Sequence, residues 1–64
     1  MTREQIEQLE KLVDTYSLAQ VVEALATIAS EKADHIRSNW QDEHMAKCWE
    51  RAAIRLDKVS AQLQ

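Results

Sequence analysis

A chain of 64 residues has room for one domain and lies near the lower size limit for folding alone, so residues 1–64 are expected to form a single domain stabilised by tight packing or self-association. The only cysteine is Cys48, which excludes an intrachain disulfide and favours a reducing, cytoplasmic location, and no apolar run has the length of a membrane-spanning helix. The net charge of −3 divides into −4 for residues 1–34 (seven acids, three bases) and +1 for residues 35–64 (four acids, five bases), which favours helix packing or self-association over bulk nucleic-acid binding.

The composition predicts an all-α fold. The chain contains neither glycine nor proline and is rich in strong helix formers, so tight turns and sheet connections are difficult to build. The first helix is predicted over residues 3–15, because Thr2 and Gln5 form a capping box at its start. Its inward side is predicted to consist of Ile6, Leu9, Leu12, Val13 and Tyr16. A helix this short is not stable alone in water and must dock on another surface.

A second helix is predicted over residues 18–37. Helix propensity falls over residues 14–17, where Ser17 and Gln20 form a second capping box and Tyr16 and Val21 are placed as a hydrophobic staple. Its buried stripe is predicted to be Leu18, Val21, Val22, Leu25, Ile28, Ala29 and Ile36. Alanines at 24, 26 and 33 would let a neighbouring helix approach closely.

Residues 37–42 are predicted to turn the chain into a third helix over residues 43–62. Asn39 is expected to take the left-handed conformation in the absence of glycine, and Asp42, rather than the alternative Ser38, is expected to cap the next helix. The third helix carries an unbroken 3-4 repeat, predicted as one buried seam, of Met45, Trp49, Ala52, Leu56, Val59 and Leu63. So short a connection predicts an antiparallel hairpin, and the first helix either crosses its open face as a three-helix bundle or swaps onto a second copy.

The possible metal ligands are His35, His44 and Cys48. His44 and Cys48 are four residues apart on one helical face, a spacing that can hold zinc. The competing interpretation is two histidines near a turn and a buried thiol, and no CxxC or HExxH motif is present. We therefore expect no metal and no cofactor, although the sequence leaves open whether these residues ever bind metal.

A basic stripe on the third helix is the first candidate binding site. It consists of Arg51, Arg55 and Lys58, with Lys47 one turn earlier. Arg37, Trp40 and Trp49 are expected near its start. Cations beside an indole can stack a base or hold a phosphate. The alternative is an ordinary solvated face, because acidic residues lie among these cations. Duplex DNA binding would need a larger basic excess than this chain has.

Ile54 is the second candidate, because all its helical neighbours are charged. A single exposed isoleucine is common, but together with Trp40 it could form a contact patch for another chain. Enzymatic activity is not expected, since the sequence has no phosphate-binding loop, no nucleophile elbow and no pair of carboxylates in an apolar setting.

The block from residue 16 to 57, above all residues 31–43 (EKADHIRSNWQDE), resembles short reading frames of bacteriophages and cyanobacteria. The resemblance covers about two-thirds of the chain, and the group has no assigned activity, so no functional residue is carried over. It implies a context: small acidic helical phage proteins act by binding, and they block a host enzyme, occlude a defence complex or sequester a signalling nucleotide.

Two functions follow as expectations. The first is a non-enzymatic, homo-oligomeric binding protein, for example a phage-type host-defence inhibitor. It would occupy a host protein surface through Trp40, Arg51, Ile54 and Arg55. The second is an oligomeric sponge for a small phosphorylated ligand, held by Arg37, Arg51, Arg55 and Lys58 where subunits meet. The expected partners are thus copies of the chain itself and a host protein or small anionic ligand, rather than a membrane or nucleic acid.

Overall fold

The computed structural model describes residues 1–39 and 41–64 and contains three helices. They are α1 (Arg3–Thr15), α2 (Leu18–Asn39) and α3 (Glu43–Leu63), and these described residues contain no strand. The predicted all-α class and three-helix arrangement are confirmed, and the helix bounds agree with the predicted ones to within two residues. Trp40 lies outside the described residues.

Polar side chains begin the helices as predicted. The Gln5 amide donates to Thr2 Oγ1 (3.2 Å) and the Thr2 amide donates to Gln5 Oε1 (2.9 Å), which completes the capping box of α1. The Gln20 amide donates to Ser17 Oγ at 3.1 Å, at the start of α2. Asp42 is the cap of α3, because its Oδ1 accepts a hydrogen bond from the Met45 amide at 3.0 Å.

The prediction of a left-handed Asn39 was wrong. Asn39 is the last residue of α2, and its side-chain amide donates to the His35 carbonyl at 3.0 Å, which holds it within the helical turn. The positive φ falls on Gln41 instead, at 53°. A glycine-free chain therefore places a long side chain in a conformation that costs about 1–2 kcal/mol for residues with a Cβ atom.

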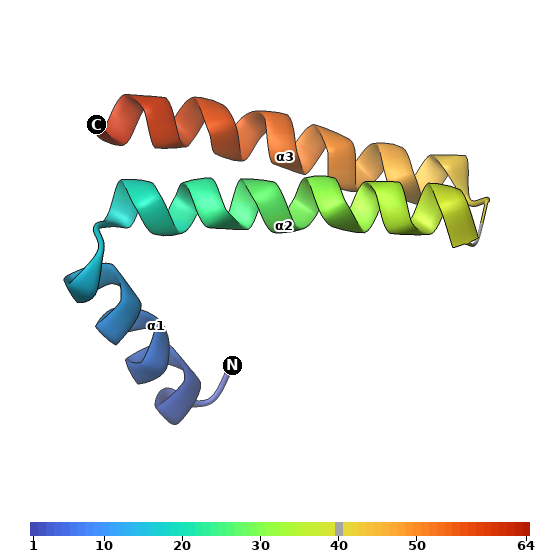
Figure 1. Cartoon of the computed structure of the whole chain (residues 1–64). Coiled ribbons are helices and arrows are strands. Elements are labelled where there is room, and N and C mark those ends of the chain that lie inside the picture. Colours follow the sequence, from blue (N-terminus) through green and yellow to red (C-terminus); the bar gives the residue numbers. More distant parts are fainter. Residues whose placement is uncertain (40) are drawn as a thin grey trace.

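Helices α2 and α3 lie side by side as an antiparallel hairpin (Figure 1). Their contact is an alanine seam, in which a small buried residue recurs at every seventh position: Ala19, Ala26 and Ala33 on α2, and Ala46, Ala53 and Ser60 on α3. Ser60 Oγ donates to the Ala19 carbonyl at 3.1 Å, and the seven-residue spacing then brings Ala26 opposite Ala53 and Ala33 opposite Ala46. Small side chains let the two backbones approach closely, as predicted for residues 26 and 33.

The predicted burial of the larger side chains is corrected by this seam. On α3, Met45, Trp49, Val59 and Leu63 are exposed, and Ala52 and Leu56 are half-buried. On α2, the exposed residues are Leu18, Ala24, Leu25 and Ile28, and the half-buried ones are Val21, Val22 and Ile36. Ala29 alone of the predicted stripe is buried. The physical reason is that the alanines, rather than the larger apolar residues, face the other helix, so the 3-4 repeat lies beside the contact instead of in it.

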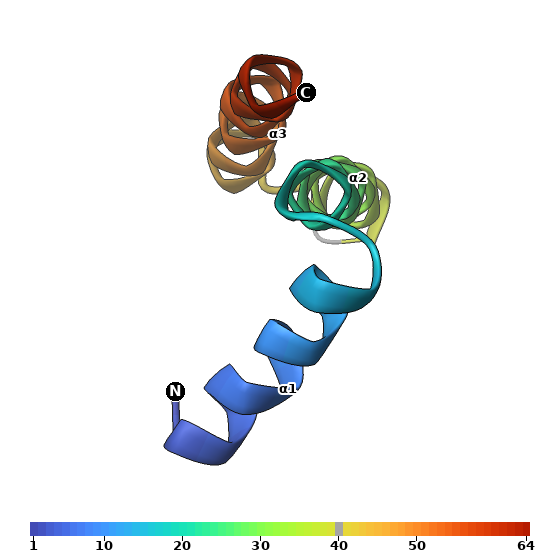
Figure 2. The same ribbon diagram turned by 90° about the vertical axis from the view of Figure 1, so that its left-hand side faces the viewer.

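Helix α1 stands apart from the hairpin. The chain bends by 116° between α1 and α2, and both views place α1 on the far side of α2 from α3 (Figures 1 and 2). No residue of α1 is buried, and of the predicted inward residues only Val13 is half-buried, whereas Ile6, Leu9, Leu12 and Tyr16 are exposed. Within one chain, α1 therefore does not cross the open face of the hairpin, and the swapped alternative stays a prediction.

The described residues contain no single helix long and apolar enough to cross a membrane. Helices α1 and α2 meet the length and composition requirement only when taken together, across the bend that separates them.

Candidate interaction site

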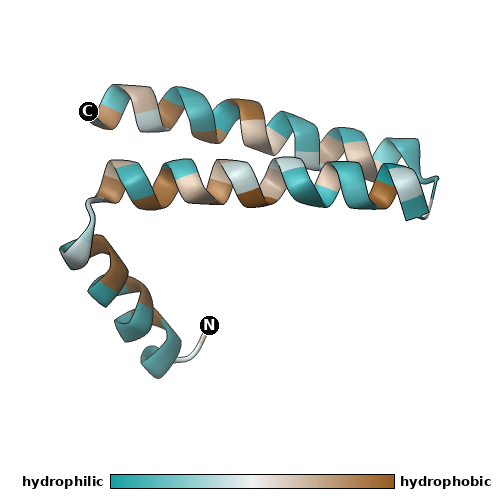
Figure 3. Ribbon diagram, viewed as in Figure 1, coloured by the Kyte–Doolittle hydropathy of each residue, from teal (hydrophilic) through white to brown (hydrophobic). Residues whose placement is uncertain are grey.

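An apolar cleft lies between α1 and α2. It has a volume of about 440 Å³ and is lined by Leu9, Leu12, Tyr16, Gln20, Val21, Ala24, Leu25 and Ile28. Figure 3 shows the hydrophobic side of α1 turned toward α2, whereas its outer side is hydrophilic. The two residues predicted as a hydrophobic staple, Tyr16 and Val21, both line this cleft. The cleft is open, and within the described chain no further element covers it.

A second apolar surface runs along one side of the hairpin. Residues three positions after each member of the alanine seam are rotated about 60° to one side of it, and in an antiparallel pair they fall on the same side of both helices. They form what we term the hairpin face: Val22, Ala29 and Ile36 on α2, and Trp49, Leu56 and Leu63 on α3. Leu18, Leu25, Met45 and Val59 extend this face outward, and Leu25 also lines the apolar cleft, so the two apolar surfaces are continuous around α2.

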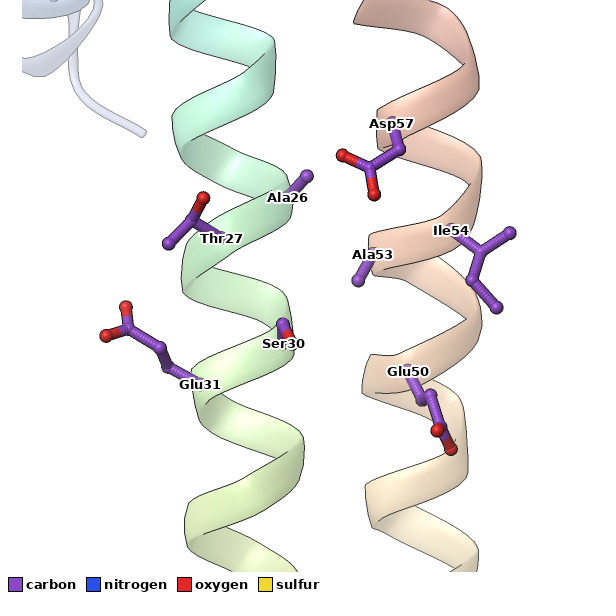
Figure 4. Close-up of a pocket in the computed structure, with 8 residues that line it drawn as sticks. All are labelled: Ala26, Thr27, Ser30, Glu31, Glu50, Ala53, Ile54 and Asp57. Carbon is purple, nitrogen blue, oxygen red and sulfur yellow. The ribbon is translucent and has the colours of Figure 1, made fainter.

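The opposite side of the hairpin is an acidic groove of about 410 Å³. It is lined by Ala26, Thr27, Ser30, Glu31, Glu50, Ala53, Ile54 and Asp57. Figure 4 shows Ala26 and Ala53 between the two helices, Thr27 and Glu31 on the α2 edge, and Ile54 directed outward on the α3 edge. Ile54 is 52 % exposed, although it is the one large apolar side chain of α3 on this side.

Arg37 links α2 to α3 at the end of the hairpin nearest the turn. Its Nε and Nη2 donate to the Glu43 carboxylate at 3.1–3.2 Å, and Nη2 also donates to Glu50 Oε2 at 3.2 Å. The hydrogen bonds to Glu43 and then to Glu50 raise the pKa of Arg37, and the hydrogen bond from Arg37 lowers the pKa of Glu43. Arg37 was predicted to bind an anionic ligand, and such a ligand would have to compete with these two carboxylates.

The basic stripe of Arg51, Arg55 and Lys58 lies on the outer side of α3, away from α2, and all three side chains are exposed. Within residues 1–39 and 41–64, none of the three makes a salt bridge. The structure thus brings Ile54 together with these three cations within two turns of one helix, as the sequence predicts. Arg37 is not part of that group, and Trp40 falls outside the description.

The possible metal ligands do not gather in the described part of the chain, where no group of three metal-binding side chains is found. His35 Nδ1 lies 3.1 Å from Asn39 Nδ2, in contact with its own helix. Cys48 is exposed, which corrects the interpretation of it as a buried thiol.

Two features were missed by the sequence analysis: the alanine seam as the main helix contact, and the apolar cleft. A signal for the seam was present in the seven-residue spacing of alanine on both helices. The bend angle that opens the cleft had no counterpart in the residue pattern.

The chain matches no protein-family model, no curated protein and no solved structure.

Proposed function

We propose that this chain is a non-enzymatic binding protein that acts by occupancy, and that it covers a surface of a partner protein with the outer side of α3. The observation that supports this is the position of Ile54. It is a large apolar side chain that is 52 % exposed, yet it lies outside the continuous apolar surface that the helices could use to pack together.

The surroundings of Ile54 resemble the anatomy of a protein interface. Glu50, Arg51, Asp57 and Lys58 are its neighbours one turn before and after on the helix surface, so an apolar centre is bordered by charges of both signs. Interfaces combine an apolar centre with a polar rim and are enriched in arginine. Burying the exposed part of Ile54 against a partner would contribute about 1 kcal/mol, and the rim charges would orient the partner.

The partner that we propose is a host protein, in keeping with the resemblance of residues 31–43 to phage reading frames. Occupancy needs no reaction, so an inhibitor of this type would act by covering a surface that a host enzyme or defence complex uses.

Site-specific photo-crosslinking tests this proposal. A photoreactive residue at position 54 is expected to capture one host protein in living cells, whereas the same residue at position 8, on exposed α1, is expected not to capture it. With that protein purified, Ile54→Glu should weaken binding at least tenfold and the matched charge change Gln8→Glu should leave binding unchanged. Equal capture from both positions, or binding that Ile54→Glu does not change, would contradict the proposal.

A second candidate is the oligomeric sponge for a small phosphorylated ligand. It is favoured by the basic stripe, whose three cations are exposed and, within the described residues, make no salt bridge. The ligand would lie where the stripes of two copies meet, and not in the acidic groove, because Glu31, Glu50 and Asp57 would repel a phosphate there.

Ligand release separates the two functions. If the sponge is correct, denatured protein purified from phage-infected cells should release an ultraviolet-absorbing compound, and Arg55→Glu protein should carry much less of it. Release of no such compound from the wild-type protein would count against the sponge and leave the occupancy proposal standing.

A further inference from the structure

The single chain exposes more surface than a protein of its size should. Its accessible surface is 5222 Å², whereas a compact monomer of 7.4 kDa exposes about 4,200 Å². Its radius of gyration is 13.5 Å, compared with about 11 Å for a compact domain of 64 residues. The excess of about 1,000 Å² is close to the roughly 800 Å² that each partner buries in a stable protein interface.

Large apolar side chains contribute to this exposed surface. The described residues include no large side chain that is fully buried, and Leu12, Leu25 and Trp49 are 47 %, 43 % and 37 % exposed. The alanine seam alone buries little apolar area per residue, so a single hairpin of this length is marginally stable. The molecule therefore needs a surface that covers the hairpin face.

Helix α1, like the hairpin face, lacks a packing partner within its own chain. It has 13 residues, none of them buried, and a helix of this length does not persist in water without tertiary packing. Its own chain holds it on the far side of α2 from α3, so it cannot reach the hairpin face of the same copy without opening the bend (Figure 2).

Length and charge fit α1 to the hairpin of another copy. A helix of 13 residues is about 20 Å long and the hairpin helices of 22 and 21 residues are about 32 Å long, so α1 fits within the hairpin face. Four acids and two bases give α1 a net charge of −2, while three acids and four bases give α3 a net charge of +1. Helix α2 has a net charge of −1, from three acids and two bases, so electrostatic attraction favours α1 beside α3 rather than beside α2.

We propose that two copies form a two-fold symmetric dimer in which α1 of each copy packs on the hairpin face of the other. This inference goes beyond the proposed function, because it assigns the apolar side of the molecule, and the partner protein was assigned to the outer side of α3. A two-fold dimer requires a surface that is complementary to itself. A chain that carries both the apolar side of α1 and the hairpin face meets that requirement.

Sedimentation equilibrium of the full chain gives the first test. At about 50 μM, the wild-type protein is expected to have twice the monomer mass of 7.4 kDa. Leu12→Glu on α1 should weaken the dimer at least tenfold, because it places a charge in the contact. The matched control is Ile54→Glu, which puts the same charge at an isoleucine of similar exposure on the opposite side of the hairpin and should leave the dimer intact.

Mixing two variants tests whether α1 packs in the other copy. Leu12→Glu damages α1, and Trp49→Glu damages the hairpin face, so a swapped homodimer of either variant has two damaged contacts. A mixed dimer has one contact with both damaged residues and one fully native contact. Equimolar mixing should therefore restore dimer that neither variant forms alone, with circular dichroism confirming that each variant is helical.

Three results would overturn the proposal. A wild-type monomer at 50 μM would show that the apolar surface serves another protein, and equal damage from Ile54→Glu would show that the interface lies elsewhere. Absence of rescue on mixing would show that α1 packs within its own chain. A wild-type monomer, or absence of rescue on mixing, overturns the dimer alone and leaves the proposed binding of Ile54 to a host protein standing.

Discussion

Ala53 shows how the hairpin depends on small side chains. It lies in the alanine seam opposite Ala26, and both side chains are buried between the helices. We expect Ala53→Leu to lower the free energy of unfolding by about 1–3 kcal/mol, because the added methylenes force the helices apart. Urea unfolding followed by circular dichroism measures this, with Ala61→Leu, at an exposed position of the same helix, as the control. An equal loss from both variants would show that the seam is not tightly packed.

The hydrogen-bonded Glu43 carboxylate makes the free energy of unfolding depend on pH. Its pKa is lowered in the folded chain by the hydrogen bond from Arg37, so the folded state favours its ionised form. This stabilisation is complete above the ordinary glutamate pKa of about 4.3 and is lost as the pH falls through the lowered folded value. Glu43→Gln should therefore be less stable than wild type at pH 7, and the difference should shrink at about pH 3, below the ordinary value.

Chemical denaturation at the two pH values checks this. The control is Glu10→Gln, since Glu10 makes no salt bridge within the described residues. The effect is small because both partners are solvent-exposed, and a difference between wild type and Glu43→Gln that stays constant with pH would contradict the assignment.

At the scale of the helices, α1 and the hairpin differ in what stabilises them. The hairpin is stabilised by contacts within one chain, whereas α1 has its capping box and little else. Amide hydrogen exchange should therefore show fast exchange in α1 and slow exchange around Ala26 and Ala53 in dilute protein. Raising the concentration should protect α1 by the largest factor, and the alanine seam should gain only the protection that the dimer adds to the global stability. Slow exchange of α1 at every concentration would mean that α1 is stable without a second copy.

The ends of the helices could be predicted from the sequence because they depend on local chemistry. Thr2, Ser17 and Asp42 each accept a hydrogen bond from the first turn of the helix that follows, whatever lies elsewhere in the chain. The side of each helix that faces its neighbour could not be predicted in the same way. The larger apolar residues give the strongest periodic signal, but that signal does not distinguish a contact within the chain from a contact with another molecule.

The candidate site, too, could be predicted from the sequence only where it depends on a single helix. Ile54 and the basic stripe could be grouped from sequence because they share one helix face. Arg37 was grouped with them by proximity to the turn, and its pairing with Glu43 and Glu50 depends on how the two helices meet. The bend that opens the apolar cleft likewise depends on tertiary structure.

At the scale of the whole molecule, the dimer separates two tasks. The apolar cleft and hairpin face lie on one side and Ile54 lies on the other, so self-association leaves the proposed partner-binding surface in solvent. If stability depends on the second copy, the melting temperature must depend on concentration.

We expect the melting temperature to rise by roughly 5 °C for each tenfold increase in protein concentration, from the entropy of unfolding of a dimer of this size. Circular dichroism melts over a hundredfold concentration range measure this, and Ile54→Glu should give the same slope. A melting temperature independent of concentration would contradict a stabilising dimer.

The seven-residue spacing of the alanine seam has a consequence for helix alignment. If α3 slipped by one heptad along α2, alanine would again meet alanine over most of the contact, so apolar packing by itself distinguishes poorly between the two registers. The hydrogen bond from Ser60 to Ala19 at one end, and the ion pairs of Arg37 at the other, would both be lost in the slipped register. Together with the short turn, these polar contacts select one alignment among several that the alanines would accept.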